Sequence, residues 1–327
     1  MSARHASLLA ALAAIWGGSY LLIKYGLEDL EPGVVVWARV ALAALVLFAV
    51  LSLRNGGTEA RAALGEMRAR PGRALLMGFL AIALPFSLIT FGELEVPSGL
   101  TAVLIAPASL FVAAFAPFID RSEGVQRSGL LGMVMGVVGV ALLVGIESVQ
   151  SLGEFLGALA MLGAAACYAL SSFVVKRYRD LSAVGVSFIS ITVGAVLTLP
   201  IALATLPSEL PGLRASLAVL VLGVVGTALA FVIFYKLIAE TGAARAALVS
   251  YLAPGVALIY GALLLDEQIT AASVVGLALI LGGVALASRQ RRAVASRVDG
   301  PDTLAAGDGV PRPGARLVGA QPSGADA

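Results

Sequence analysis

The residues best suited to contact a small molecule belong to a motif that the chain contains twice. It reads IWGGSYLLIK over residues 15–24 and CYALSSFVVK over residues 167–176, so a ring, a hydroxyl and a final lysine interrupt each apolar segment. Trp16 of the first copy corresponds to Tyr168 of the second, and a serine follows each ring three positions later. Residues three apart share one face of an α-helix. The motif therefore predicts two helices that each present a ring and a hydroxyl together.

This motif has two interpretations. Its rings and hydroxyls could bind a substrate, or Gly17, Gly18 and the serines could allow close packing of helices. The lysines at the ends, Lys24 and Lys176, are typical of long side chains that reach the membrane surface.

Arg39 is the most anomalous charge in the sequence. It follows Pro32 by seven residues and so lies about 10 Å along a helix that rises ~1.5 Å per residue. An arginine at this depth of a membrane usually faces the interior of a helix bundle or a water-filled cavity. Arg39 could bind an anionic group of a substrate or pair with Glu28, Glu31 or Glu93, or its stem could carry the charge to the headgroups.

Three prolines predict interruptions of helices. Pro107 and Pro254 lie near the middle of apolar segments, where each removes a hydrogen bond and frees a carbonyl, that of Val103 or Ser250. Interrupted helices near the middle of the bilayer are where transporters form substrate sites. Pro85 is a candidate hinge in an earlier segment. The alternative is that all three are structural kinks.

The residues of metal and acid–base chemistry are scarce. The chain has one cysteine, Cys167, and one histidine, His5, without metal-ligand spacing, and catalytic carboxylates do not converge. We therefore expect that the protein is not an enzyme and that it binds neither a metal ion nor a cofactor.

The elements that position these residues follow from composition. Hydrophobic residues make up 59% of 327 positions and charged residues 13%, and the mean hydropathy is +0.97. A membrane-spanning helix needs ~20 mostly apolar residues. The chain offers ten such segments, at 7–26, 32–53, 73–92, 97–119, 128–146, 154–176, 182–205, 214–237, 243–265 and 271–288. This predicts an all-α polytopic membrane protein with ten transmembrane helices.

Charge is distributed unevenly between the two sets of loops. One set, with both termini, is rich in arginine and lysine, and the other is rich in acids. The first contains Arg54, Arg61, Arg68, Arg70, Arg73, Arg121, Arg127, Lys176, Arg177, Arg179, Arg245, Arg289, Arg291, Arg292 and Arg297; the second contains Glu28, Asp29, Glu31, Glu93, Glu95, Glu147, Glu154, Glu209, Asp266 and Glu267. Positively charged loops face the cytoplasm, so both termini are expected there.

The second half of the chain repeats the first. Besides the opening motif, Leu-Pro-Phe at 84–86 matches Leu-Ala-Phe at 229–231, and GVVGVAL at 136–142 matches ILGGVAL at 280–286. Because each half has five helices, the halves have opposite orientations in the membrane, as in many secondary transporters. The predicted boundaries are a cytoplasmic N-terminus at 1–6, a first five-helix repeat at 7–146, a second at 154–288 and a disordered tail at 289–327.

The ordered set of segments resembles a known family. IWGGSYLLIKYGLEDLEPGVVVWARVALAALVL, ALPFSLITFGELEVPSGLTAVLIA and GTALAFVIFYKLIAETGAARAALVSYLAPGVALIYGALLLDEQIT are similar to helices of EamA-type transporters of the drug/metabolite transporter superfamily. The resemblance covers about 8–288 and implies a 5+5 inverted repeat in the bacterial inner membrane. It also implies that the first and sixth helices face a central cavity. The expected substrate-binding residues are Trp16, Ser19, Tyr20, Arg39, Tyr168, Ser171, Ser172, Ser250 and Tyr251, with Pro85, Pro107 and Pro254 as kink or gating residues.

These observations predict a secondary transporter that moves a small metabolite, such as an amino acid or a derivative, by alternating access. The alternatives are a channel and a non-transport membrane subunit. Facilitated diffusion or exchange is favoured over proton coupling, because no acid lies mid-span and only Glu93, near a helix end, could serve. The expected partners are a small-molecule substrate and the lipid bilayer, and no nucleic acid. Gly132 and Gly136 form a face that could pair within a monomer or across a homodimer.

Overall fold

The structure is a computed structural model that describes residues 2–119, 127–145, 151–175, 177–178, 181–241 and 248–298. These residues form helices and connecting turns, without a strand. Seven helical segments are long and apolar enough to cross a membrane, and three shorter apolar helices accompany them. The seven are Ala3–Gly26, Pro32–Leu53, Pro71–Gly92, Ser98–Ile119, Leu152–Val175, Ala183–Ala204 and Leu213–Phe234; the shorter ones are Leu130–Leu142, Val249–Leu264 and Ala271–Leu286. The prediction of an all-α polytopic membrane protein is confirmed.

The described residues of the first half form eight α-helices, a 3-10 turn and a π-helix. In order they are α1 (Ala3–Gly26), α2 (Pro32–Leu53), η1 (Asn55–Gly57), α3 (Thr58–Ala69), α4 (Pro71–Gly78), the π-helix η2 (Phe79–Ala83), α5 (Leu84–Gly92), α6 (Ser98–Ile105), α7 (Ala108–Ile119) and α8 (Arg127–Gly145). Local sequence explains several ends. Pro32 and Pro71 begin helices, where the missing N–H is no loss. Gly56 and Gly57 adopt positive φ in the turn before α3.

The described residues of the second half form a similar series of helices, and residues 205–212, between α10 and α11, contain no helix that corresponds to α3. The elements of this half are α9 (Leu152–Val175), α10 (Ala183–Ala204), α11 (Leu213–Gly223), the π-helix η3 (Val224–Leu229), α12 (Ala230–Thr241), α14 (Val249–Leu264) and α15 (Ala271–Val298). Some residues named in the sequence analysis lie outside the described part of the chain. They are residues 120–126, Lys176 and the tail from 299 onward.

Two features were not anticipated from the sequence. The arginine-rich loop after α2 contains the amphipathic helix α3, whose apolar face buries Ala60 and Ala63. Helix α15 continues to Val298, ten residues beyond the predicted end of the last membrane segment at residue 288. Arginine and alanine are strong helix formers, and extending an existing helix avoids the cost of nucleation.

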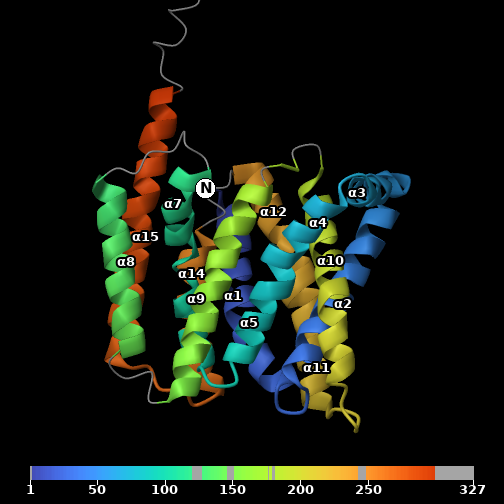
Figure 1. Cartoon of the computed structure of the whole chain (residues 1–327), viewed down its shortest axis with the longest axis horizontal. Helices are drawn as coiled ribbons and strands as arrows, with labels where there is room; N and C mark the ends of the chain where they lie inside the picture. The colour runs from blue at the N-terminus through green and yellow to red at the C-terminus, as the bar shows by residue number, and fades with distance from the viewer. Residues whose placement is uncertain are drawn as a thin grey trace, which may run out of the picture.

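The helices form one bundle with two differently charged ends (Figure 1). The loops after α1, α5, α10 and α14 lie at one end, together with Glu28, Glu93 and Glu267; we call this the acidic end. The N-terminus and α3 lie at the other, which carries Arg61 and Arg70 and is called the basic end.

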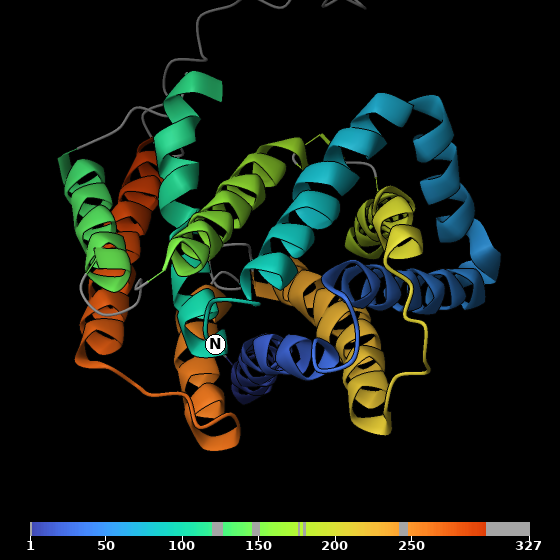
Figure 2. The ribbon, with the colours of Figure 1, turned by 60° about the horizontal axis from the view of Figure 1, so that its bottom comes forward.

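Close packing between distant segments holds the bundle together. Helix α1 packs against α14 and α11, α2 against α10, and α5 against α9. Gly17 permits the first of these contacts, since a Cβ there would lie 2.9 Å from the Ala253 carbonyl oxygen. Helices α8 and α15 lie side by side at one edge (Figures 1 and 2). Gly132 faces Gly283 in that pair, so the predicted glycine face is used within the chain.

Three interruptions occur in the membrane segments. Helix α6 ends at Ile105 and α7 begins at Ala108, so Pro107 lies in a break between them. The third segment contains η2, which is followed at once by Pro85 in the first turn of α5. The π-helix η3 has no proline. π-Helices are rare and are frequent at functional sites.

Candidate functional site

Arg39 lies inside the bundle, between the two halves of the chain. Its side chain is 5% exposed, and its Nε and Nη2 donate hydrogen bonds of 3.4 and 3.3 Å to Thr227 Oγ1 in η3. The guanidinium carbon lies 4.1 Å from the centroid of the Phe86 ring on α5, a cation–π distance. Thr227 in turn donates to the Leu222 carbonyl, 2.9 Å away. Arg39 therefore faces the bundle interior, and in this conformation its side chain does not extend toward the lipid headgroups.

The surroundings of Arg39 bring together both copies of the opening motif. Tyr20 on α1 and Tyr168 on α9 lie close enough to interact electrostatically with Arg39 and with each other, and Glu93 is a further such neighbour. Tyr20 and Tyr168 also pack against the same apolar cluster, which includes Val103. We call Tyr20, Arg39, Glu93 and Tyr168 the central polar cluster.

Glu93 is the fully buried acid of this cluster. It follows Gly92, the last residue of the third membrane segment, and its side chain is 0% exposed. Neither of its carboxylate oxygens accepts a hydrogen bond from the described residues. Burial raises the pKa of Glu93 well above its ordinary value; the charge of Lys24 opposes this rise, Glu267 adds to it, and Arg39 opposes it.

Lys24 has a more specific place than the membrane surface. Its Nζ donates a hydrogen bond to the main-chain carbonyl of Glu93. This bond ties the end of α1 to the end of α5. It also brings a positive charge close to the Glu93 carboxyl.

Trp16 lies in a separate aromatic group. Its ring centroid is 5.1 Å from that of Phe234 and 6.1 Å from that of Phe231, both on α12, and the second pair is edge-to-face. Such pairs stabilise contacts between helices. Phe86 and Phe231 occupy matching positions in the sequence repeat. Phe86 contacts Arg39 and Phe231 contacts Trp16, so both rings contact residues that the sequence had singled out.

The motif serines bond to their own helices. Ser19 Oγ donates to the Ile15 carbonyl at 2.9 Å, Ser171 to Tyr168 at 2.9 Å, and Ser172 to Ala169 at 2.7 Å. Ser19 also faces Gly226 of η3, where a Cβ would lie 2.9 Å from Ser19 Oγ. Each hydroxyl proton is thus used locally, whereas the oxygen lone pairs remain able to accept from a ligand.

The remaining predicted site residues lie on α5, α14 and the break before α7. Ser250 and Tyr251 are in the first turn of α14, and Pro254 is buried in the same helix, which continues through it. Tyr251 packs against the apolar cluster that also contacts Tyr20 and Tyr168. Pro85 is buried near the start of α5.

Two partners of Arg39, Thr227 and Phe86, were not expected from sequence, whereas Glu93 had been named as one of three possible acidic partners. The sequence repeat held a signal for Phe86, because it pairs with Phe231. Glu93 was noted as a carboxylate at a helix end, but its burial depends on helices from elsewhere in the chain. Thr227 is an ordinary hydroxyl in an apolar segment and carried no signal.

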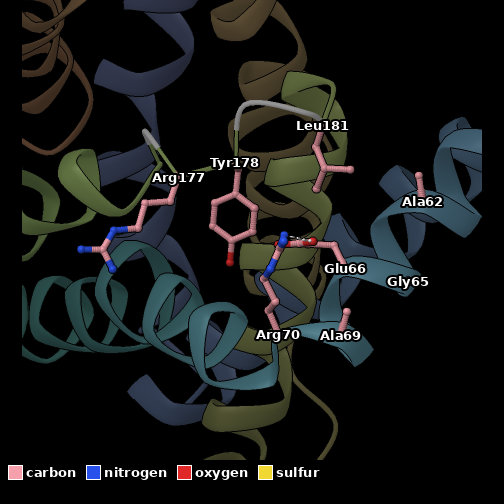
Figure 3. Close-up of a pocket in the computed structure, with 8 residues that line it drawn as sticks. All are labelled: Ala62, Gly65, Glu66, Ala69, Arg70, Arg177, Tyr178 and Leu181. Atoms are coloured by element: carbon pink, nitrogen blue, oxygen red, sulfur yellow. Dashed lines mark hydrogen bonds and ion pairs between the residues drawn. The ribbon is translucent and has the colours of Figure 1, made fainter.

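Two surface pockets lie away from this cluster. One, of about 130 Å³, is at the basic end beneath α3; in it Arg70 meets Glu66, with a hydrogen bond of 2.8 Å, and the Tyr178 ring points into the same space (Figure 3). The other, of about 350 Å³, is at the acidic end and is lined by Glu95, Glu154 and Glu267 among others. Glu267 accepts hydrogen bonds from the Ser98 and Gly99 amides at 2.7 and 2.9 Å and so caps α6.

Comparison with known proteins identifies related chains. The uncharacterized inner membrane transporter YedA of Escherichia coli K12 is 28% identical over 284 residues, covering 85% of this chain and 88% of YedA. The uncharacterized transporter YoaV of Bacillus subtilis is 24% identical over 280 residues, 84% of this chain and 94% of YoaV. A probable amino-acid metabolite efflux pump of Salmonella typhimurium is 27% identical over 296 residues, 87% and 94% of the two chains.

A solved crystal structure has the same fold. It superposes with a TM-score of 0.63, at 19% sequence identity, over 89% of this chain and 100% of that chain. The EamA-like transporter family itself matches residues 4–145 and again residues 155–289. Because these two matches span most of the sequence, the chain belongs to the EamA-like transporter family.

Proposed function

We propose that the protein is a secondary transporter that moves a small metabolite, such as an amino acid or a derivative, across the bacterial inner membrane by alternating access. The observation that carries this proposal is the link from Arg39 on α2 to Thr227 in η3. A buried arginine that joins the two halves of a membrane bundle can bind an anionic group and respond to their relative movement.

An inverted 5+5 repeat supports alternating access. The two π-helices begin at Phe79 and Val224, 145 positions apart, which is the offset of the Leu-Pro-Phe and Leu-Ala-Phe pair. The helix contacts follow the same symmetry, since α1 packs against α14 while its repeat partner α9 packs against α6. Two domains related in this way can exchange conformations and expose a central site to either side.

The chemistry of the central polar cluster favours a substrate that carries a carboxylate. Arg39 supplies the guanidinium. Tyr20, from the first half of the chain, and Tyr168, from the second, each supply an aromatic ring with a hydroxyl group. Amino acids and their derivatives have such a group, and the Salmonella relative is named as an amino-acid metabolite efflux pump. Orientation follows from the charged loops, which favour a cytoplasmic basic end with both termini inside.

Counterflow in proteoliposomes tests this function. Vesicles loaded with one unlabelled L-amino acid at a time should take up the same labelled amino acid, with saturation, and Arg39→Ala should reduce that uptake. Flux without saturation would favour the channel alternative. If no amino acid or acylated amino acid undergoes counterflow, the proposed substrate class is wrong.

A further inference from the structure

The carboxyl of Glu93 is buried without a hydrogen-bond partner, and a second unpartnered group lies beside it. Thr90 Oγ1, in the last turn of α5, is fully buried and makes no hydrogen bond with the described residues. Thr90 and Glu93 are three positions apart and share a helix face. Leaving a buried polar group without a hydrogen-bond partner is unfavourable, and more so when the group is charged. Two such groups on one face indicate a place that receives a proton or a polar ligand.

Charged and titratable groups surround Glu93 from each element that contributes to its environment. Tyr20 and Lys24 come from α1, Arg39 from α2, and Glu267 from the loop between α14 and α15. Tyr168, on α9, is a neighbour of Tyr20 and Arg39. The cluster thus contains a guanidinium that suits a carboxylate and, near it, a carboxylate that suits an ammonium group.

We propose that Glu93 is the coupling residue of a proton antiporter for zwitterionic amino acids, and that a proton and the substrate ammonium group compete for its carboxyl. Arg39 holds the substrate carboxylate. When the substrate leaves, Glu93 takes up one proton and becomes neutral, which suits a buried carboxyl without a partner. When the next substrate enters from the other side, Glu93 releases that proton and its carboxylate pairs with the ammonium group.

Charge balance follows from this exchange. The zwitterion has no net charge and the proton carries one, so each cycle moves one positive charge against the direction of the substrate. The proposal rests on the amino-acid transport proposed above and replaces the facilitated diffusion favoured from sequence. That preference depended on the lack of a mid-span acid, whereas the structure shows that the acid at the end of α5 is fully buried.

The decisive experiment compares counterflow with gradient-driven uptake in the same proteoliposomes. For an L-amino acid that shows counterflow, an acidic vesicle interior should drive accumulation by the wild type. In Glu93→Gln this accumulation should fall to the level of protein-free vesicles. Counterflow needs no net proton movement, so it should persist at high substrate concentration, with a weaker apparent affinity because the ammonium group has lost its carboxylate. The matched control is Glu95→Gln, two residues away on the exposed surface, which should accumulate like the wild type.

Competition adds a quantitative readout. Below the pKa of Glu93, the apparent affinity of the wild type for the amino acid should weaken about tenfold per pH unit, and Glu93→Gln should remove this dependence. The proposal is overturned if the wild type shows counterflow but no accumulation from a pH gradient. It is equally overturned if Glu93→Gln accumulates as the wild type does.

A measurement without substrate separates this proposal from the transport proposal. Infrared difference spectra of the purified protein should show the carbonyl stretch of a protonated carboxylic acid at neutral pH. The band should be absent from Glu93→Gln and shifted in Glu93→Asp, with folding of each variant checked by size-exclusion chromatography. If this band is absent from the wild type, the coupling role is wrong even where amino-acid counterflow is present. If no amino acid shows counterflow, the substrate proposal fails. The infrared band, where it is present, would still show that Glu93 binds a proton, and the transported substrate would then belong to another class.

Discussion

Arg39 on α2 and Thr227 in the π-helix η3 are joined by hydrogen bonds of 3.3 and 3.4 Å, across 188 positions of sequence. The π-helix explains why Thr227 is available. Its wider turn lets Thr227 Oγ1 donate to the carbonyl of Leu222, five residues earlier, while its lone pairs accept from the guanidinium. Each half of the chain thus contributes one member of a buried pair near the centre of the bundle.

Removing the hydroxyl of Thr227 should destabilise the fold. Thr227→Val keeps the shape but leaves the buried Arg39 guanidinium without this acceptor, at a cost of ~1–3 kcal/mol. Thr227→Ser should retain most of the stability. Thermal unfolding of the three proteins in detergent, followed by circular dichroism, measures the difference. Equal melting temperatures for the valine variant and the wild type would contradict the importance of this bond.

Arg39 should be required for transport as well as for packing. A charge-assisted hydrogen bond to a substrate carboxylate is worth ~1.5–3 kcal/mol, so Arg39→Ala should lower the apparent affinity about 10- to 100-fold. Arg39→Lys keeps the charge but loses the planar fork and should be intermediate. Substrate concentration series in the counterflow assay measure the affinity. An unchanged affinity in Arg39→Ala would remove Arg39 from the site.

Trp16 provides a test between substrate binding and packing. Trp16→Ala loses the contacts with Phe231 and Phe234 and should destabilise the protein by at most the ~3–5 kcal/mol of a fully buried aromatic truncation. Trp16→Phe keeps an aromatic contact and should melt within a few degrees of the wild type. If Trp16 only packs, Trp16→Phe transports normally. A loss of transport in this stable variant would instead place the indole in contact with substrate.

The contact between α1 and α14 should depend on Gly17 of α1 and not on Gly255 of α14. A Cβ on Gly17 would lie 2.9 Å from the Ala253 carbonyl oxygen and from the Val256 side chain, so Gly17→Ala overpacks the contact at ~1–3 kcal/mol. A Cβ on Gly255 of α14 would meet no neighbouring atom within 4 Å, so Gly255→Ala is the control and should be neutral or stabilising. Melting temperatures in detergent distinguish the two variants.

Tyr178 should make stability depend on alkaline pH. It follows α9 outside the membrane segments, and burial raises its pKa from 10.0 to about 12; Arg73 opposes this rise and Glu66 adds to it. Between these two values the folded state holds the phenol proton that the unfolded state has lost, so stability should fall as the pH rises. Tyr178→Phe should remove this part of the pH dependence. Melting curves from about pH 9 to about pH 12 measure it, and parallel curves for both proteins would contradict it.

Sequence alone determined the membrane class, most helix positions and the place of Arg39 along its helix. Helix α2 occupies the predicted residues 32–53, because apolar length and a leading proline are local properties that need no partner. Pro107 marked a break for the same reason, since its ring conflicts with its own helix. The amphipathic helix α3 was missed because its short, charged sequence becomes a helix by packing its alanines on the bundle.

Tertiary structure decided what each of these residues contacts. Arg39 meets Thr227 and Phe86, and Glu93 is buried, because segments far apart in sequence pack around them. Trp16 and Tyr20 are neighbours in one motif, yet the first packs on α12 and the second joins the central polar cluster. Helical periodicity assigns a residue to a face of its helix, but the partner on that face depends on non-local packing. The sequence therefore specified which side chains were unusual, and the fold specified which of them meet.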